Sequence, residues 1–475
     1  MTRQAGADHR QAGAGTLRCG VFKLARWHGA GEGSSVAMTG DSVTGGSGTE
    51  GSGGSGTEGS GVAEETPSVA PERRSLHLLV PALAIVVLLA ALVGVQLVRP
   101  VPRGELRLSV PDSLTLPGQV TDVPWPAQGQ ARLDVDGLGT LGGSGADRPI
   151  PIGSVAKVMT AYVVLADHPL APGQAGPSIT VTAADVDDYE SRIPGGQSLV
   201  AVEAGQPLTE RQALEALLLP SANNVAQILA KWDAGSVEAF VAKMNAAAVQ
   251  LGLVDTHYTD PSGLAPSTVS TADDQTVLAQ RALTMPAFAE IVALPSTVLP
   301  VAGAVTNYNS LLGTDGVVGV KTGSTDEAGG NLVFAARLTV AGRTLTVVGA
   351  VLGQPGTGTP QQLAAANGVT RGLLAAARRL VQTYPALPAG TVGQVRGAWG
   401  ASVAVRTAAP VQIVGWPGLT VGVRAKPAEF GGRPRAGQVV GALTVHTGLG
   451  DTAVDLTAGG TLSEPSAWWR LTRTR

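Results

Sequence analysis

The longest apolar segment of the 475-residue chain covers residues 78–98. It carries no charge, and only Pro81, Gly94 and Gln96 interrupt the hydrophobic run. A helix of this length crosses the hydrocarbon core of a bilayer. A cleaved signal peptide fits less well, because the run is longer than a signal core and no small-residue cleavage site follows it. A buried core helix is the other alternative, and the flanking Gly/Ser-rich and Pro-rich segments argue against it. We therefore predict an uncleaved transmembrane anchor at 78–98.

The segment before this anchor shows no hydrophobic periodicity. From Met38 it becomes acidic and rich in Gly, Ser and Thr, and residues 46–53 are repeated identically as 54–61. Such a composition buries little apolar surface, so we predict a disordered tail over residues 1–77. The change at Met38 also suggests the hypothesis that translation begins there, which leaves residues 1–37 untranslated.

Beyond the anchor, the pattern first predicts a proline-bearing linker at 99–120. A region in which helical and strand periodicities are mixed then extends to residue 383. Thr209 and Gln212 form a capping box that opens a helix ending at Leu219. The other predicted helices are 236–251, 271–283 and 360–383, and the predicted strands are 131–138, 317–321, 331–340 and 343–352, the last two joined as a hairpin at 341–342.

The pattern changes again after residue 384. Short Val- and Thr-rich runs at 402–406, 419–424 and 439–446 are separated by Gly and Pro, which predicts a small all-β domain over 384–475. The adjacent Trp468 and Trp469 lie in a segment too short for a membrane-surface amphipathic helix. We expect these tryptophans to pack on the β-domain.

Composition narrows the possible functions. The chain is 44% hydrophobic and 15% charged, as expected of a multi-domain protein with a substantial core. A net charge of −3 gives no indication of nucleic-acid binding. Cys19 is the single cysteine, which rules out an intrachain disulfide and a cysteine metal site, and the six histidines lack ligand-like spacing. We expect no metal and no other cofactor.

Ser154 and Lys157 form an S-x-x-K pair at a predicted helix start. A lysine one turn beyond a serine lies on the same helix face and can accept the hydroxyl proton when the lysine is neutral. The positive end of the helix dipole also favours negative charge on the serine. Only six of the 33 basic residues are lysines, so a lysine at 157 is informative, because arginine cannot serve as a base.

Two further motifs follow in order. Ser221 and Asn223 form S-x-N, and residues 321–323 read K-T-G. Together the three motifs are the signature of penicillin-recognising serine acyl enzymes. Over about residues 123–352 the chain resembles the serine-type D-alanyl-D-alanine carboxypeptidases, the low-molecular-weight penicillin-binding proteins. The similar stretches include 157–161, 217–224, 270–273, 309–312 and 319–329.

The resemblance implies a mixed α/β fold. A transpeptidase/β-lactamase-like domain, a helical cluster plus an antiparallel sheet, would occupy residues 121–383, with the small all-β domain after it. It also implies that Ser154 attacks the D-Ala-D-Ala carbonyl, Lys157 accepts the proton, Ser221 relays it to the leaving D-alanine, and Asn223 orients Lys157 and the substrate.

The resemblance further implies a substrate-binding group on the K-T-G strand. Lys321 and Thr322 would bind the terminal carboxylate, and Lys321 would lower the pKa of Lys157. Gly323 would leave the strand edge open to substrate, and the backbone N–H groups of Ser324 and Ser154 would form an oxyanion hole. Tyr308 replaces a basic residue that some relatives place before their N-x-L-L segment, and Ser324 replaces a bulkier one.

The expected function is therefore a membrane-anchored carboxypeptidase that removes the terminal D-alanine of peptidoglycan stem pentapeptides. Its partners would be the stem peptide, β-lactam antibiotics as inhibitors, and the cell membrane, with the catalytic domain extracytoplasmic and no nucleic acid bound. Arginines flank the anchor on both sides, so charge does not set its orientation. The alternatives are a D,D-endopeptidase, a class A type β-lactamase, disfavoured by Ala222 where those enzymes carry aspartate, and a non-enzymatic wall-binding protein.

Overall fold

The computed structural model describes residues 76–145 and 148–474. The predictions about residues 1–75, namely the tail, its repeat and the start at Met38, lie outside the described residues. Residues 79–475 form one compact unit.

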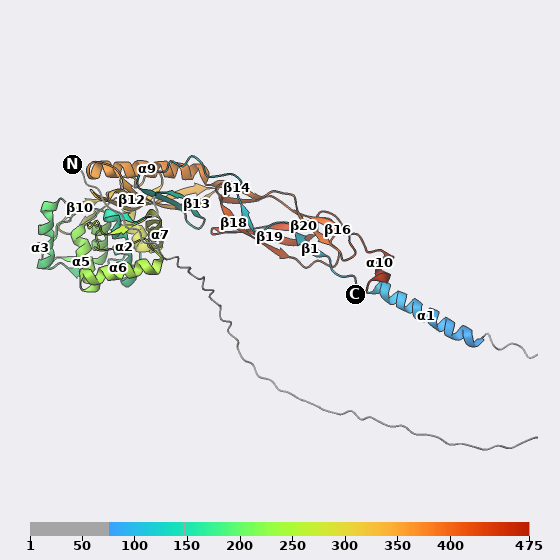
Figure 1. Cartoon of the computed structure of the whole chain (residues 1–475). Coiled ribbons are helices and arrows are strands. Elements are labelled where there is room, and N and C mark those ends of the chain that lie inside the picture. Colours follow the sequence, from blue (N-terminus) through green and yellow to red (C-terminus); the bar gives the residue numbers. More distant parts are fainter. Residues whose placement is uncertain (1–75, 146–147, 475) are drawn as a thin grey trace, which may run out of the picture. The chain divides into compact units, whose positions relative to one another are not determined.

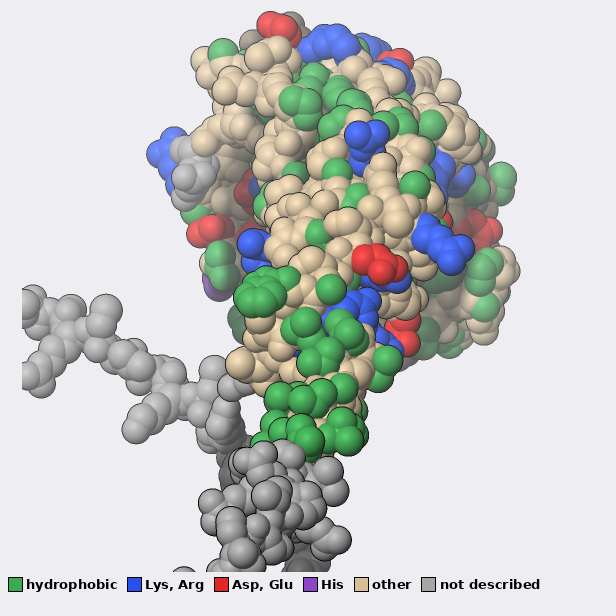
Figure 2. Space-filling model, turned by 90° about the vertical axis from the view of Figure 1, so that its right-hand side faces the viewer, with side chains coloured by type: hydrophobic (Ala, Val, Ile, Leu, Met, Phe, Trp, Pro, Cys, Tyr) green, Lys and Arg blue, Asp and Glu red, His purple; other side chains and the backbone are tan. Residues whose placement is uncertain are grey.

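Helix α1 (Leu76–Val98) occupies the segment predicted to be the anchor. Its residues 79–98 are apolar and long enough to cross a membrane, and none of the span is buried. In the space-filling view of Figure 2, hydrophobic side chains gather along this helix. The length and the exposed apolar surface fit a single-pass membrane helix.

The central region alternates short helices with strands. The helices are η1 (Gly153–Ala156), α2 (Lys157–Asp167), α3 (Ala183–Arg192), η2 (Ile193–Gly195), α4 (Glu210–Leu218), α5 (Asn223–Ala234), α6 (Val237–Leu251), α7 (Ala272–Leu283), α8 (Pro286–Val292) and α9 (Gly358–Leu380). The strands are β3 (Gln130–Val135), β4 (Gly139–Ser144), β5 (Ile150–Pro151), β6 (Ser178–Thr180), β7 (Pro207–Thr209), β8 (Val269–Ser270), β9 (Ser296–Leu299), β10 (Gly303–Thr306), β11 (Val317–Thr325), β12 (Gly329–Val340) and β13 (Arg343–Gln354).

The central sheet is antiparallel and has the strand order β11-β12-β13-β3-β4. Strand β12 is buried on both faces over most of its length. In β12, Val333 and Ala335 pack with the helical cluster, whereas Leu332, Phe334 and Ala336 pack with the core that includes α9. Figure 1 shows α9 along one face of the sheet and the cluster with α2, α5, α6 and α7 on the other. This confirms the mixed α/β fold, and it leaves β11 as an edge strand.

The local signals are confirmed with small shifts at the ends. Thr209 and Gln212 make the reciprocal capping box of α4, and α6 ends at Gly252 in the left-handed conformation. Strand β11 is longer than predicted and continues to Thr325, through the whole K-T-G segment. The predicted helix 360–383 is too long, because residues 382–387 form strand β14, which pairs with β17.

The C-terminal region is all-β, as expected. It contains β14 (Gln382–Leu387), β15 (Thr391–Arg396), β16 (Ser402–Thr407), β17 (Val411–Gly415), β18 (Thr420–Pro427), β19 (Val439–Thr447), β20 (Gly450–Ala458) and a short helix α10 (Ala467–Thr472). Five of these strands join a seven-stranded sheet in the order β1-β15-β16-β20-β19-β18-β2, with two strands from elsewhere in the chain.

The segment 99–120, predicted to be only a linker, supplies those two strands. β1 (Glu105–Leu108) pairs with β15, and β2 (Ser113–Thr115) pairs with β18. Both flank the sheet at its edges, and Leu116 is buried in its core. The proline content pointed to a linker, but tertiary pairing decides strand formation in short segments. In sequence, the central region is therefore inserted between β2 and β14.

Trp468 and Trp469 differ in their packing and exposure. Trp469 lies with its ring 6.0 Å from that of Trp399 in the β-domain, as expected, whereas Trp468 is 75% exposed. Arg473, which follows α10, stacks on Trp469 and donates to the backbone carbonyls of Gln96 and Pro100 at the end of α1. The C-terminus thus contacts the last turn of α1.

Because β1 and β2 complete the C-terminal sheet, we expect a chain beginning at residue 121 to be less stable than one beginning at 101. Loss of residues 101–120 exposes the edges of β15 and β18. It also removes the Leu116 side chain and leaves a cavity in the core of the sheet. Thermal unfolding and light scattering of the two purified fragments test this. Equal melting temperatures and equal solubility would contradict the structural role of residues 101–120.

Candidate active site

Ser154 lies in the single turn η1, which continues directly into α2 at Lys157. Two glycines shape this turn. Gly153 has a φ of 54°, in the left-handed region that suits glycine, and a Cβ on Gly263 would lie only 1.8 Å from the Gly153 carbonyl oxygen. Glycine at both positions brings the loop around residue 263 against the turn that carries Ser154.

The side chain of Lys157 is fully buried, and its Nζ atom has three close polar neighbours. It lies 2.7 Å from Asn223 Oδ1, 2.8 Å from the Ser262 carbonyl oxygen and 2.8 Å from Ser154 Oγ. Burial holds the pKa of Lys157 well below its usual range, and the charge of Lys321 lowers it further, whereas Asp260 opposes the shift. A lysine with so low a pKa is available as a neutral amine.

A neutral amine has two N–H donors and one lone pair. Asn223 Oδ1 and the Ser262 carbonyl can only accept, so they take both N–H groups of Lys157. The lone pair is then left for the third neighbour, the Ser154 hydroxyl. The arrangement can therefore remove the proton from Ser154 Oγ.

Ser221 lies between α4 and α5 with a φ of 66°, a strained conformation for a residue with a side chain. It is buried, and its Oγ has no hydrogen-bond partner among the described residues. Asn223 opens α5, and its amide Nδ2 donates to Gln197 Oε1 at 3.1 Å, which directs its Oδ1 to Lys157.

The K-T-G segment lies on edge strand β11, against the turn of Ser154. A Cβ at Gly323 would lie 2.9 Å from the Ile152 carbonyl oxygen and 3.0 Å from the Ser154 nitrogen. Glycine is thus required at 323 so that β11 can approach the nucleophile turn. This reason differs from the open strand edge expected from the sequence.

Of the remaining predicted residues, Lys321 is buried and Ser324 is partly exposed. Lys321 is 1% exposed, its Nζ donates to the Thr322 carbonyl at 3.0 Å, and burial lowers its pKa to about 7. Ser324 Oγ donates its proton to Gln362 Oε1 and lies 3.1 Å from the Thr359 hydroxyl, and both of these residues are on α9.

A cavity of about 340 Å³ joins these parts. Six of the eight predicted residues line it: Ser154, Ser221, Asn223, Thr322, Gly323 and Ser324. Lys157 and Lys321 are buried and do not line it. Tyr308 and Gln197 also line its wall. The three sequence motifs therefore meet around one cleft.

The sequence reasoning missed the loop that accepts from Lys157. Asp260 accepts from Ser262 N (3.1 Å), Leu264 N (3.0 Å) and Thr268 Oγ1 (2.7 Å), and these contacts fix the Ser262 carbonyl. The run Asp-Pro-Ser-Gly at 260–263 is a turn signal that could have located the loop. It could not have shown that a main-chain oxygen takes part.

Comparisons with known proteins agree with this geometry. A family model described as D-alanyl-D-alanine carboxypeptidase matches residues 140–355. The D-alanyl-D-alanine carboxypeptidase DacB2 of Mycobacterium tuberculosis is 37% identical over 226 residues, which cover 46% of this chain and 73% of that protein. The chain belongs to the D-alanyl-D-alanine carboxypeptidase family. Its members are serine hydrolases.

Other relatives of this carboxypeptidase are similar to the same region. A D-alanyl-D-alanine carboxypeptidase of a Streptomyces species is 36% identical over 230 residues, covering 45% of this chain and 76% of that protein. The crystal structure of the Streptomyces K15 DD-transpeptidase is 31% identical and covers 55% of this chain and all of that one, with a TM-score of 0.45.

We expect Gly323→Ala to slow acylation by a fluorescent penicillin by about 100-fold, because the new Cβ pushes β11 away from the Ser154 turn. Gly368→Ala is the matched control, since its Cβ would meet nothing within 4 Å. Stopped-flow labelling of both variants checks this. Acylation by Gly323→Ala at the rate of the control would refute the close-approach argument.

Proposed function

We propose that this carboxypeptidase releases the terminal D-alanine of peptidoglycan stem pentapeptides through an acyl-enzyme on Ser154. The proposal rests chiefly on the Lys157 amine, whose lone pair is left for Ser154 Oγ at 2.8 Å once two carbonyl oxygens take its N–H groups. Family membership supplies the substrate class, a peptide that ends in D-Ala-D-Ala.

In the acylation step, Ser154 Oγ forms a bond to the penultimate D-alanine carbonyl carbon, and its proton passes to Lys157. The developing oxyanion accepts from the backbone N–H groups of Ser154 and Ser324; one such donor contributes about 3 kcal/mol to transition-state stabilisation. The peptide C–N bond then breaks, and the proton reaches the leaving amine of D-alanine through the Ser221 hydroxyl.

Water completes the cycle by attacking the ester, with Lys157 as the base, and the shortened peptide leaves. In the Michaelis complex Thr322 donates its hydroxyl to the terminal carboxylate. The adjacent Lys321 is buried, and its positive charge stabilises the carboxylate through a medium of low dielectric constant.

β-Lactams are expected to acylate Ser154 by the same attack and to act as inhibitors. A D,D-endopeptidase activity is the second candidate, because a relative from Pseudomonas aeruginosa that carries that name is 33% identical over 197 residues. Cleavage of a crosslinked muropeptide, measured beside release of terminal D-alanine, separates the two activities.

We also propose that α1 anchors the chain in the cell membrane as a single span, with the catalytic domain extracytoplasmic. The support is the exposed apolar surface of α1 and the location of the proposed substrate outside the cell. We further propose that the catalytic domain extends from about residue 121 to 381, and that the β-domain consists of residues 382–475 together with strands β1 and β2.

Ser154→Ala should lower the release of D-alanine from a muramyl-pentapeptide mimic by at least about 1,000-fold, because the acyl-enzyme cannot form. The assay uses the full chain in detergent and follows free D-alanine. Ser191→Ala, which removes an exposed hydroxyl from α3, should leave the rate unchanged. Release at the wild-type rate by Ser154→Ala would disprove the assignment.

The pH dependence of kcat/KM should report both lysines. Lys157 must be neutral, so activity falls as the pH drops through its lowered pKa, and Lys321 must be charged, so activity also falls as the pH rises above about 7. Lys321→Arg keeps its charge at all these values, so its alkaline limb should move up by more than one pH unit. Lys426→Arg, on exposed β18, is the control. An unmoved alkaline limb in Lys321→Arg would show that another group titrates there.

A further inference from the structure

The end of the β-domain that meets α1 is joined to the last turn of this helix by main-chain contacts. Arg470 of α10 donates to the Leu97 carbonyl at 3.0 Å. Arg473 donates to the Pro100 carbonyl, also at 3.0 Å. Because the apolar span ends at Val98, this end of the β-domain lies at the boundary between hydrocarbon and water when α1 crosses a bilayer.

Tryptophan residues are found at the same end. Trp468 on α10 is 75% exposed, and the neighbouring Trp469 packs edge-on against Trp399 in the turn between β15 and β16. Tryptophan is enriched where a bilayer meets water, because its apolar ring and its polar N–H group suit that layer. The exposed Trp468 therefore fits a location among lipid headgroups.

A cavity of about 220 Å³ lies beside the turn between β15 and β16. Its lining includes Arg103, Arg107 and Arg396, with Glu105 as the one carboxylate. Glu105 lies opposite Arg396 in the pairing of β1 with β15, but its carboxylate accepts from Arg107 at 2.8 Å. Arg103 and Arg396 are exposed, and neither forms an ion pair with another described residue. The cavity, which we call the arginine pocket, is thus basic.

The wall of the arginine pocket is held in a fixed shape. Within the turn, Gly397 N donates to the Ala401 carbonyl at 2.9 Å, and Gly400 N donates to the Gly397 carbonyl at 3.0 Å. Trp399 packs so closely on Gly397 that a Cβ there would lie 2.6 Å from the ring, and its Nε1 donates to the Ser463 carbonyl at 3.0 Å. The pocket is therefore linked through Trp399 and α10 to the end of α1.

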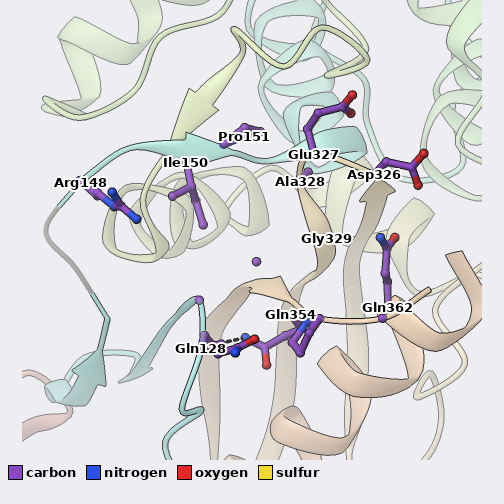
Figure 3. Close-up of a pocket in the computed structure, with 14 residues that line it drawn as sticks. Gln128, Arg148, Ile150, Pro151, Asp326, Glu327, Ala328, Gly329, Gln354 and Gln362 are labelled. Carbon is purple, nitrogen blue, oxygen red and sulfur yellow. Dashed lines mark hydrogen bonds between the residues drawn. The ribbon is translucent and has the colours of Figure 1, made fainter. Parts of the chain in front are cut away.

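Figure 2 views the molecule from this end and shows Lys and Arg side chains over the face from which α1 projects. A larger cavity of about 500 Å³, beside the turn between β11 and β12, lacks such a concentration of one charge. Figure 3 shows Asp326 and Glu327 pointing away from its middle, with Arg148 on its far side. The arginine pocket is the better candidate for an anion site.

We propose that Arg103, Arg107 and Arg396 bind the phosphate headgroup of an anionic phospholipid from the membrane that α1 spans. Guanidinium N–H groups match the geometry of phosphate oxygens, and basic residues next to a membrane span attract anionic lipids. The membrane is the source of the ligand because the pocket is linked to the end of the span. The bound lipid gives the β-domain a second attachment to the bilayer. The inference rests on the proposed membrane span and does not depend on the carboxypeptidase reaction.

The experiment measures lipid binding to the full chain in an uncharged detergent by native mass spectrometry. The probes are phosphatidylglycerol, which is anionic, and phosphatidylcholine, which has no net charge. We expect phosphatidylglycerol to bind about tenfold more tightly in about 50 mM ammonium acetate. The preference should shrink in about 0.5 M ammonium acetate, because salt screens the arginine charges.

Two sets of variants test the pocket itself. Arg103→Gln with Arg396→Gln should bring the preference close to one. Arg281→Gln with Arg424→Gln removes the same charge from exposed positions on α7 and β18 and should keep the preference. Glu105→Gln frees Arg107 from its carboxylate partner, so it should tighten phosphatidylglycerol binding by about threefold.

Equal binding of the two lipids by the wild-type chain, or a preference that persists in Arg103→Gln/Arg396→Gln, overturns the lipid site. Displacement of phosphatidylglycerol by an equal concentration of inorganic phosphate would assign the pocket to a free anion and overturn the lipid assignment. If the double variant melts at a lower temperature than the wild type, Glu105→Gln decides, and unchanged binding in that variant overturns the site.

Two further measurements separate this inference from the proposed function. A chain that leaves the membrane fraction without detergent overturns both the span α1 and the lipid site. Release of D-alanine by the same preparations tests the carboxypeptidase activity independently, and we expect Arg103→Gln/Arg396→Gln in detergent to keep the wild-type rate.

Discussion

The chemistry depends on one buried amine that is kept neutral and oriented. Lys157 is enclosed by three segments: its own helix α2, the start of α5 through Asn223, and the loop that contains Ser262. Burial alone would lower the pKa of the amine but leave its lone pair free to rotate. The two carbonyl acceptors remove this freedom, because they bind the two N–H groups in fixed directions. Packing thus sets the protonation state, and hydrogen bonds set the geometry.

The backbone beside this amine is strained at Ser221, which has a φ of 66°. Gly153 and Gly263 also lie in the left-handed region, but glycine adopts it without strain. For a residue with a side chain, such a conformation costs free energy and persists where the surrounding fold enforces it. Here the residues after Ser221 are held by main-chain hydrogen bonds, because Ala222 N donates to the Ala216 carbonyl at 3.0 Å and Asn223 N donates to the Ser198 carbonyl at 2.8 Å. The fold therefore stabilises a site whose local geometry is unfavourable by itself.

The parts predicted well from the sequence are those with local causes. The capping box of Thr209, the helix end at Gly252, the β12–β13 hairpin and the three motifs all depend on nearby residues, and the structure contains each of them. The parts missed depend on distant partners. The pairing of β1 and β2, the strand β14 and the contact of Lys157 with the Ser262 carbonyl have no compositional trace, because main-chain groups are the same at every position. The packing role of Gly323 could not be predicted for the same reason, because the atoms that it approaches are main-chain atoms of the Ser154 turn.

The order of strands in the C-terminal sheet has a consequence for synthesis. β1 and β2 leave the ribosome before the inserted central region, whereas β15 and β18 leave it afterwards. Long-range pairing of this kind forms late and slowly, since the intervening chain must be ordered or looped out first. A chain that ends before β15 therefore carries β1 and β2 without their partners, and their unpaired backbone groups are open to pairing with the wrong strand.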